Sequence, residues 1–366
     1  MGKAQQFTNI QGLRAIAALM VVCDHIFGLP IFQTHSLAPY ARAIGPAGVD
    51  IFFVISGFVV YLSADRLGRE KQFKGRIPLL WDLAVKRCFR IYPVYWVAFL
   101  LATILLPLAK GINFGTDDQS TLRLLLLMEY PNSRVPAAWT LVYEMYFYAV
   151  CAVALFVFPR RILWVLSGWL GAIFVVWLVS WVPGWDYSWY RTLTPFVLEF
   201  AFGILIAELV KRDIYGYAAS TLAIGVGGLV FGAIVFGLHG NWFNQTAMWR
   251  VMCIGFPSAF IVYSLVAIER RSGWVFTGPW NALGDASYSL YLWHQLVFTV
   301  SVFAFLPAFQ RTGLPMSLFG ITLVTIAVFI GFLSYHLIEK PIHRGEFVKR
   351  LAEGRPYRYR ATIPAE

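Results

Sequence analysis

Long apolar runs dominate this sequence, and each is about as long as a helix that crosses a membrane. A spanning helix needs about 20 mostly apolar residues. Barrel-type membrane strands alternate apolar and polar residues, whereas these runs are continuously apolar, so helices are predicted. The expected fold class is an all-α integral membrane protein, a bundle of about ten transmembrane helices. The runs lie near residues 12–32, 44–64, 89–109, 139–158, 162–182, 191–210, 218–238, 248–268, 286–307 and 315–338.

The composition excludes a soluble enzyme. Hydrophobic residues make up 59% of the 366 residues and charged residues 13%, whereas a soluble domain is about 45–50% apolar and about 25% charged. No polar linker divides the chain. We therefore predict one transmembrane domain over residues 1–341, followed by a basic tail over residues 342–366. The first apolar run lacks a small-residue cleavage site, so we expect it to stay in the mature protein.

The basic residues indicate an orientation. The net charge is +11, but the basic residues lie between apolar runs, which favours membrane orientation over a nucleic-acid partner. If the N-terminus is cytoplasmic, the inner segments hold 23 of the 30 Lys and Arg residues. Both termini are therefore expected in the cytoplasm. Residues 65–88 are expected to form a basic cytoplasmic loop, and residues 110–138 the longest outer segment, with a short apolar element at Leu122–Met128.

Ionisable side chains within the runs are functional candidates, because a charge at the centre of a membrane helix costs about 2.5 kcal/mol or more. His25, Asp24, Asp50 and Glu144 are predicted at similar depths in the outer half of the membrane. A histidine whose tautomer and basicity are set by a carboxylate is suited to general-base catalysis. The structural alternatives are a packing role for His25 and a role for Asp50 and Glu144 as partners of a buried arginine.

A second, cationic layer is predicted at the cytoplasmic end, from Arg14, Arg87 and Arg90. Arg14 and His25 are eleven residues apart, so on a helix they share a face and lie about 16 Å apart along the axis. Arg87 and Arg90 also share a helix face. Guanidinium groups suit phosphates, and the alternative is that these arginines contact lipid headgroups.

The remaining ionisable groups are expected to have structural roles. Helix–helix hydrogen bonds are the favoured interpretation of His294, Glu199 and Glu339. The four cysteines have no CxxC neighbour, so neither a disulfide framework nor a metal site is expected.

Six blocks follow one another from residue 7 to residue 341. They are Arg14-x10-His25 within FTNIQGLRAIAALMVVCDH, GVDIFFVISGF at 48–58, Arg87-x-x-Arg90 within KRCFRIYP, WTLVYE at 139–144, LGDASYSLYLWH and IEKP. In order and on predicted helices, these blocks resemble the membrane acyltransferase-3 family. The fourth block has Thr140 where the family usually has serine.

The resemblance implies a ten-helix enzyme of the inner (plasma) membrane. Such an enzyme takes an acyl group, most commonly acetyl, from cytoplasmic acyl-CoA and places it on a hydroxyl of an extracytoplasmic glycan or lipid-linked sugar. It has no permanently bound cofactor. We expect the chain to act without the C-terminal SGNH domain of some relatives, alone or with envelope polysaccharide-assembly proteins.

Applied to the residues, the resemblance implies that Arg14, Arg87 and Arg90 hold the CoA phosphates. His25 would act as the base, with Asp24, Asp50 or Glu144 orienting it, or would itself be transiently acylated. Two other classes stay open at this point, a transporter or flippase of a lipid-linked saccharide and a structural subunit of a polysaccharide-export assembly. Binding of acetyl-CoA would separate the enzyme from both.

Overall fold

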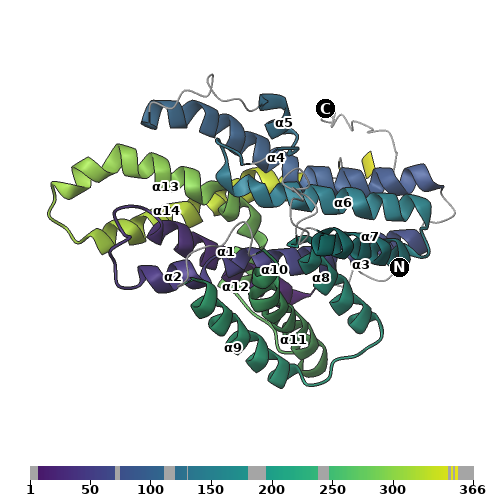
Figure 1. Cartoon of the computed structure of the whole chain (residues 1–366). Coiled ribbons are helices and arrows are strands. Elements are labelled where there is room, and N and C mark those ends of the chain that lie inside the picture. Colours follow the sequence, from purple (N-terminus) through teal and green to yellow (C-terminus); the bar gives the residue numbers. More distant parts are fainter. Residues whose placement is uncertain are drawn as a thin grey trace, which may run out of the picture.

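The computed structural model describes residues 7–70, 75–110, 120–129, 131–179, 195–237, 247–344, 348, 351 and 352, and these ranges contain helices and no strand. The α-helices are α1 (Thr8–Phe27), α2 (Ala38–Ile44), α3 (Ala47–Glu70), α4 (Arg76–Lys110), α5 (Thr121–Leu125), α6 (Trp139–Val157), α7 (Ile162–Val179), α8 (Val197–Lys211), α9 (Ala218–Gly237), α10 (Ala247–Arg250), α11 (Phe256–Ser272), α12 (Pro279–Asp285), α13 (Ser287–Gln310), α14 (Met316–Ser334) and α15 (Lys340–Arg344). Figure 1 shows the helices packed against one another, with α1 in contact with α2, α3, α11, α12 and α13. A 3-10 turn covers Pro136–Ala138, and two π-helical turns cover Val251–Gly255 and Tyr335–Glu339.

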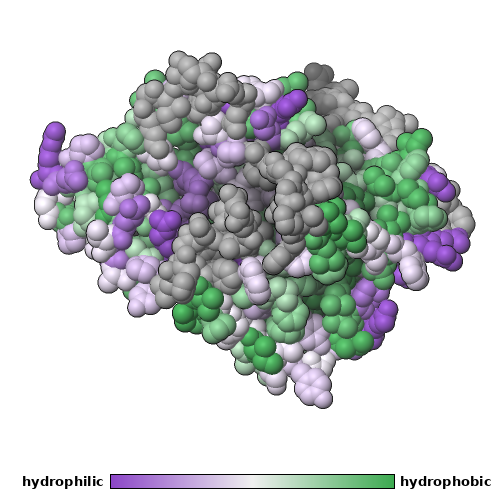
Figure 2. Space-filling model, viewed as in Figure 1, coloured by the Kyte–Doolittle hydropathy of each residue, from purple (hydrophilic) through white to green (hydrophobic). Residues whose placement is uncertain are grey.

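The all-helical prediction is confirmed for this part of the chain. Within the described ranges, nine helical segments are long and apolar enough to cross a membrane. Their outer faces carry exposed apolar side chains, such as Trp164 on α7, Phe231 on α9 and Phe329 on α14. Figure 2 shows broad hydrophobic surface on the face in view. A soluble protein would bury such side chains, whereas lipid contacts them without cost.

The predicted run at 191–210 is only partly described. Its second half forms α8, which is 15 residues long, and residues 180–194 lie outside the described ranges. The predicted tail at 342–366 and the outer segment around Asp117 and Asp118 also lie mostly outside them. Three described tail residues pack back onto the start of α4, where Trp81 Nε1 donates to the carbonyl oxygen of Leu351 at 2.7 Å.

The prediction of a loop over residues 65–88 is wrong. α3 continues to Glu70 and α4 begins at Arg76. The apolar pattern ends before the helices do, because their ends carry charged residues in helical pairs. Asp65 and Arg69 approach to 3.0 Å, and Asp82 and Lys86 to 2.7 Å, each with i,i+4 spacing. The expected apolar element Leu122–Met128 overlaps the short helix α5, whose carbonyls accept hydrogen bonds from α4.

The N-terminus of α1 is held by another helix. Residue Phe7 at its N-cap offers no side-chain acceptor, so the first free N–H groups need one from elsewhere. Glu269 of α11 supplies it, accepting from the backbone N–H of Thr8 at 3.0 Å and of Asn9 at 2.8 Å. The Asn9 side chain donates to the carbonyl oxygens of Leu265 and Trp274. α1 therefore has a fixed start, and the position of Arg14 follows from it.

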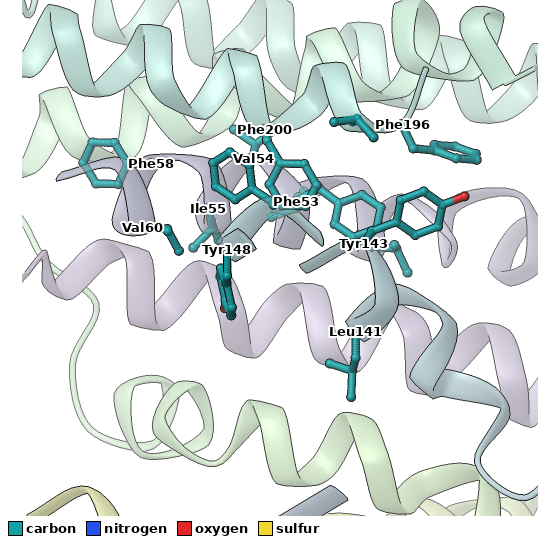
Figure 3. Close-up of a cluster of buried hydrophobic side chains, with 14 of the residues drawn as sticks. Phe53, Val54, Ile55, Phe58, Val60, Leu141, Tyr143, Tyr148, Phe196 and Phe200 are labelled. Atoms are coloured by element: carbon teal, nitrogen blue, oxygen red, sulfur yellow. The ribbon is translucent and has the colours of Figure 1, made fainter. Parts of the chain in front are cut away.

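Glycines bring α3 and α8 into backbone contact. A Cβ atom on Gly203 would lie 2.2 Å from the carbonyl oxygen of Val54, and one on Gly57 would lie 2.2 Å from that of Phe200. Small residues permit such close crossings in membrane bundles. Beside the crossing lies the aromatic group drawn in Figure 3, in which the ring centroids of Phe53 and Phe200 are 5.1 Å apart.

The α3–α8 crossing gives a stability prediction. We expect Gly203→Ala to destabilise the protein by about 1–3 kcal/mol, because the added methyl group must push two helix backbones apart. Gly227→Ala is the matched control, since a Cβ there meets nothing within 4 Å. Thermal unfolding of the two purified variants in detergent measures the difference. Equal unfolding temperatures would contradict the close crossing.

Candidate active site

A largely apolar cavity of about 380 Å³ lies between α1, α3, α4, α6 and α13. That volume is within the range of ligand sites in proteins, which are usually apolar with a few placed polar groups. Here the charged groups are the three predicted arginines and Glu144. The polar and aromatic lining residues that matter for the chemistry are Arg14, Ser56, Arg87, Arg90, Thr140, Glu144, Tyr148, Tyr288 and Tyr291.

The three arginines meet in this cavity, but they differ in their partners. Arg90 donates to the buried carboxylate of Glu339, which follows α14 in the chain. Arg87 lies with its guanidinium carbon 5.4 Å from the Tyr148 ring centroid, and its buried Nε has no hydrogen-bond partner among the described residues. Arg14 Nη1 donates to the side chain of Gln11 at 3.3 Å. Arg14 and Arg87 are thus the cations most available to an anionic ligand.

Glu144 lies in the same cavity. Its carboxylate accepts from Ser56 Oγ at 2.7 Å and from the Tyr148 hydroxyl at 3.2 Å. It shares the lining of the cavity with Arg14 and Arg90. The sequence placed Glu144 beside His25, and the structure instead places it beside the arginines. The reason is the packing of α6 against α13. Thr140, which lies one turn before Glu144 on α6, donates to the Tyr291 hydroxyl at 3.0 Å.

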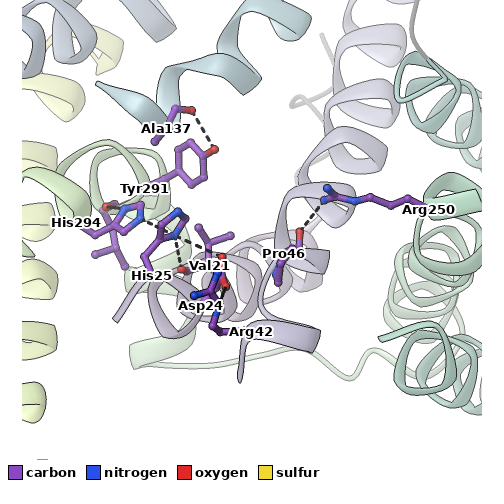
Figure 4. Close-up of polar contacts among 10 residues, drawn as sticks. Val21, Asp24, His25, Arg42, Pro46, Ala137, Arg250, Tyr291 and His294 are labelled. Carbon is purple, nitrogen blue, oxygen red and sulfur yellow. Dashed lines mark hydrogen bonds and ion pairs between the residues drawn. The ribbon is translucent and has the colours of Figure 1, made fainter. Parts of the chain in front are cut away.

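His25 lies beyond the Tyr291 end of the cavity and faces α13 (Figure 4). Its Nδ1 is 2.8 Å from the carbonyl oxygen of Val21 and 3.3 Å from Nε2 of His294. The Asp24 carboxylate is 3.9 Å from the same Nδ1, and Arg42 lies 4.0 Å from the other Asp24 oxygen. Asp24 is therefore close enough for an ionic interaction with His25, though it makes no hydrogen bond to it.

Asp50 lies in a different buried group. Arg250, which is 1% exposed, donates to both Asp50 oxygens, with Nη2 at 2.6 Å and Nε at 3.1 Å. Arg250 Nη2 also donates to the carbonyl oxygen of Pro46 at 3.2 Å, as Figure 4 shows. The fully buried Glu199 lies against Asp50. The structure thus joins Asp50 to α8 and α10 and does not bring it to His25.

Sequence reasoning missed three partners in these groups: His294, Arg250 and Ser56. For His294 the sequence did carry a signal. Tyr288, Tyr291 and His294 follow one another at intervals of three residues, so on one helix they lie on the same face. All three side chains are buried, and the face they form runs from Arg90, whose guanidinium lies 5.6 Å from the Tyr288 ring, to His25. No group of three or more metal-ligating side chains occurs within the described ranges.

Comparison with known proteins covers most of the described part of the chain. The sequence model of the family described as "Acyltransferase domain" matches residues 7–335. The chain is 29% identical to the exopolysaccharide production protein ExoZ of Rhizobium meliloti, over 88% of this chain and 98% of that protein. It is 25% identical to the putative membrane-bound transacylase BcsY of Komagataeibacter xylinus, over 91% and 82% respectively.

A third relative is longer than this chain. The peptidoglycan O-acetyltransferase OatA of Listeria monocytogenes is 25% identical over 93% of this chain, and the match covers 56% of that protein. No solved structure matches the chain.

The Asp50–Arg250 pair generates a stability prediction. We expect Asp50→Ala to destabilise the protein by about 3–5 kcal/mol, because it leaves a buried guanidinium without its carboxylate. Asp50→Ala combined with Arg250→Met should recover most of that loss, since no charge is then left unpaired by the change. Thermal unfolding in detergent measures both. If Asp50→Ala alone unfolds at the wild-type temperature, the pair does not hold α3 to α10.

Proposed function

The chain belongs to the acyltransferase-3 family. We propose that it transfers an acyl group, most commonly acetyl, from cytoplasmic acyl-CoA to a glycan hydroxyl outside the inner membrane. The chain is a membrane acyltransferase of the class that moves groups other than aminoacyl groups. ExoZ is an exopolysaccharide production protein and OatA a peptidoglycan O-acetyltransferase, which supports a polysaccharide as the acceptor.

The observation that carries the proposal is the cavity, which is lined by the arginines and by Tyr291, the neighbour of the histidine pair. Arg14, Arg87 and Arg90 line one part of it, and Tyr291 lines another. The Tyr291 ring centroid is 5.9 Å from that of His294, which contacts His25. A phosphate-bearing donor with a long uncharged arm fits this order of groups, because guanidinium groups bind phosphates in a fixed geometry and apolar walls bury the arm.

The orientation of the donor follows from the positive-inside rule. The segments that border the arginine end carry most of the Lys and Arg residues and are proposed to be cytoplasmic. CoA would bind with its phosphates at Arg14 and Arg87 and extend its thioester towards Tyr291. The acceptor hydroxyl would reach His25, whose side chain is 34% exposed, from the other side.

The chemistry assigns a role to each group. His25 Nε2 takes the proton of the acceptor hydroxyl as the oxygen attacks the thioester carbonyl. The tetrahedral intermediate collapses, the carbon–sulfur bond breaks, and the CoA thiolate takes the proton back from His25. An ester and free CoA are the products. Glu144, hydrogen-bonded to Ser56 and Tyr148, balances the charge of the arginines when no donor is bound.

The donor site is tested by binding. We expect Arg87→Ala to weaken binding of acetyl-CoA to the purified protein by about tenfold or more, because it removes charge-assisted hydrogen bonds to phosphate. Arg76→Ala is the matched control, a cation of the same helix that is exposed and lies outside the cavity. Calorimetry in detergent measures both affinities.

A control for folding accompanies this test. Arg90→Ala alone leaves the buried Glu339 without its cation, so Arg90 should be tested together with Glu339→Gln. If Arg87→Ala binds acetyl-CoA with unchanged affinity, the proposal of a donor site in this cavity is wrong. The alternative, that Arg87 contacts lipid headgroups, would then be favoured.

The base is tested by turnover. We expect His25→Ala to lower acyl transfer by about 10²–10⁴-fold, the usual cost of losing a general base, while acetyl-CoA still binds. His25→Gln should be nearly as inactive, because it keeps hydrogen bonding without the base. Transfer of radiolabelled acetyl groups to glycan in membrane vesicles measures the rate, with the loop variant His35→Ala as control. Near-normal transfer by a folded His25→Ala protein would refute the assignment.

A further inference from the structure

His294 on α13 faces His25 on α1 inside the bundle, although 269 residues separate them in sequence. The His294 side chain is fully buried. The two ring centroids lie 4.9 Å apart with an interplanar angle of 62°, so the edge of one ring meets the other (Figure 4). An edge contact between two imidazoles brings ring nitrogens within hydrogen-bond distance, and here His294 Nε2 is 3.3 Å from His25 Nδ1.

The backbone contacts fix which nitrogens carry protons. His25 Nδ1 lies 2.8 Å from the Val21 carbonyl oxygen, and His294 Nδ1 lies 3.2 Å from the Leu290 carbonyl oxygen. A carbonyl oxygen only accepts, so each Nδ1 is the donor and bears the hydrogen. Each neutral ring then has its lone pair on Nε2. His294 Nε2 can accept from His25 Nδ1–H, which it shares with Val21, and His25 Nε2 is left free for a substrate.

We propose that His294 is the positioning residue of the reaction, the group that orients His25 and stabilises its protonated form. This assignment rests on the proposed role of His25 as the base. When His25 Nε2 takes the acceptor proton, the positive charge spreads over the ring, and the Nδ1–H bond to His294 strengthens. In many hydrolases a buried carboxylate makes the corresponding contact. Here a neutral imidazole makes it.

The groups around the pair support this division of roles. Asp24, on α1, lies 3.9 Å from His25 Nδ1, beyond hydrogen-bond distance, and it also faces Arg42. On the α13 side, the rings of Tyr291 and Phe298 pack on His294, each with its centroid 5.9 Å away. His294 thus packs between two aromatic rings, which fix the orientation of its imidazole. Asp24 acts on His25 only through its charge.

The test compares two replacements of His294 in the full-length protein. His294→Gln keeps an acceptor oxygen near the position of Nε2, whereas His294→Phe keeps the ring volume and removes the acceptor. We expect His294→Phe to lower kcat roughly 10- to 100-fold, the usual cost of losing the hydrogen-bond partner of a functional histidine. KM and binding of acetyl-CoA should stay unchanged, and His294→Gln should recover part of the rate.

The matched control is His336→Phe. Like His294, His336 has its Nδ1 near a backbone carbonyl oxygen one turn earlier, that of Phe332 at 2.9 Å. Unlike His294, it is exposed, and its ring lies against Tyr335 and not against a histidine. Its replacement should not change kcat. A rate for His294→Phe equal to or above that of His294→Gln would show that ring volume alone matters and would overturn the proposal.

A second readout separates this inference from the proposed function. Diethyl pyrocarbonate acylates the free nitrogen of an imidazole, and mass spectrometry of the peptide that holds residue 25 follows it without any turnover. We expect the rate at His25 to fall about threefold or more in His294→Phe and to stay near wild type in His294→Gln, because the partner raises ring basicity. Equal rates in all three proteins would overturn the role of His294. A wild-type protein that transfers no acetyl, yet shows these differences, would overturn the proposed function alone.

Discussion

Inside a membrane a charged side chain must find its partner within the protein, because the lipid offers none. This constraint ties distant helices together here. Arg250 and Asp50 join α10 to α3, and Arg90 and Glu339 join α4 to the π-helical turn after α14. At Nε of Arg87, which has no partner among the described residues, the proposed donor would supply one.

Local pattern predicted the helices, because these depend on residues a few positions apart. The apolar runs gave the spans. The partners of the charges depend on the packing of helices that are far apart in sequence. Asp50 was placed by depth alone and grouped with His25, yet a cation 200 residues away holds it. Glu144 was misplaced for the same reason, since depth does not say which face a neighbouring helix presents.

The arginines and the histidine pair are connected by two helices that run beside each other. α1 carries Arg14 and His25 about 16 Å apart, and α13 carries Tyr288 near Arg90 and His294 at His25. That span is about half of a hydrocarbon core of about 30 Å. In the proposed reaction, with the donor on one side and the acceptor on the other, the substrates themselves would have to cover the rest of the distance. A donor with a long flexible arm would meet this requirement, and a short one would not.

The hydrogen bonds from the start of α1 to Glu269 also impose an order on biogenesis. Among the described helices α1 leaves the ribosome first, but the carboxylate that caps it lies 260 residues later. At about 5–20 residues per second, a new chain needs roughly 10–50 s of further synthesis before that contact can form. During this interval α1 must wait in the lipid or at the insertion machinery with its first amides uncapped. The start of the helix that bears His25 can thus be capped only after α11 has been made.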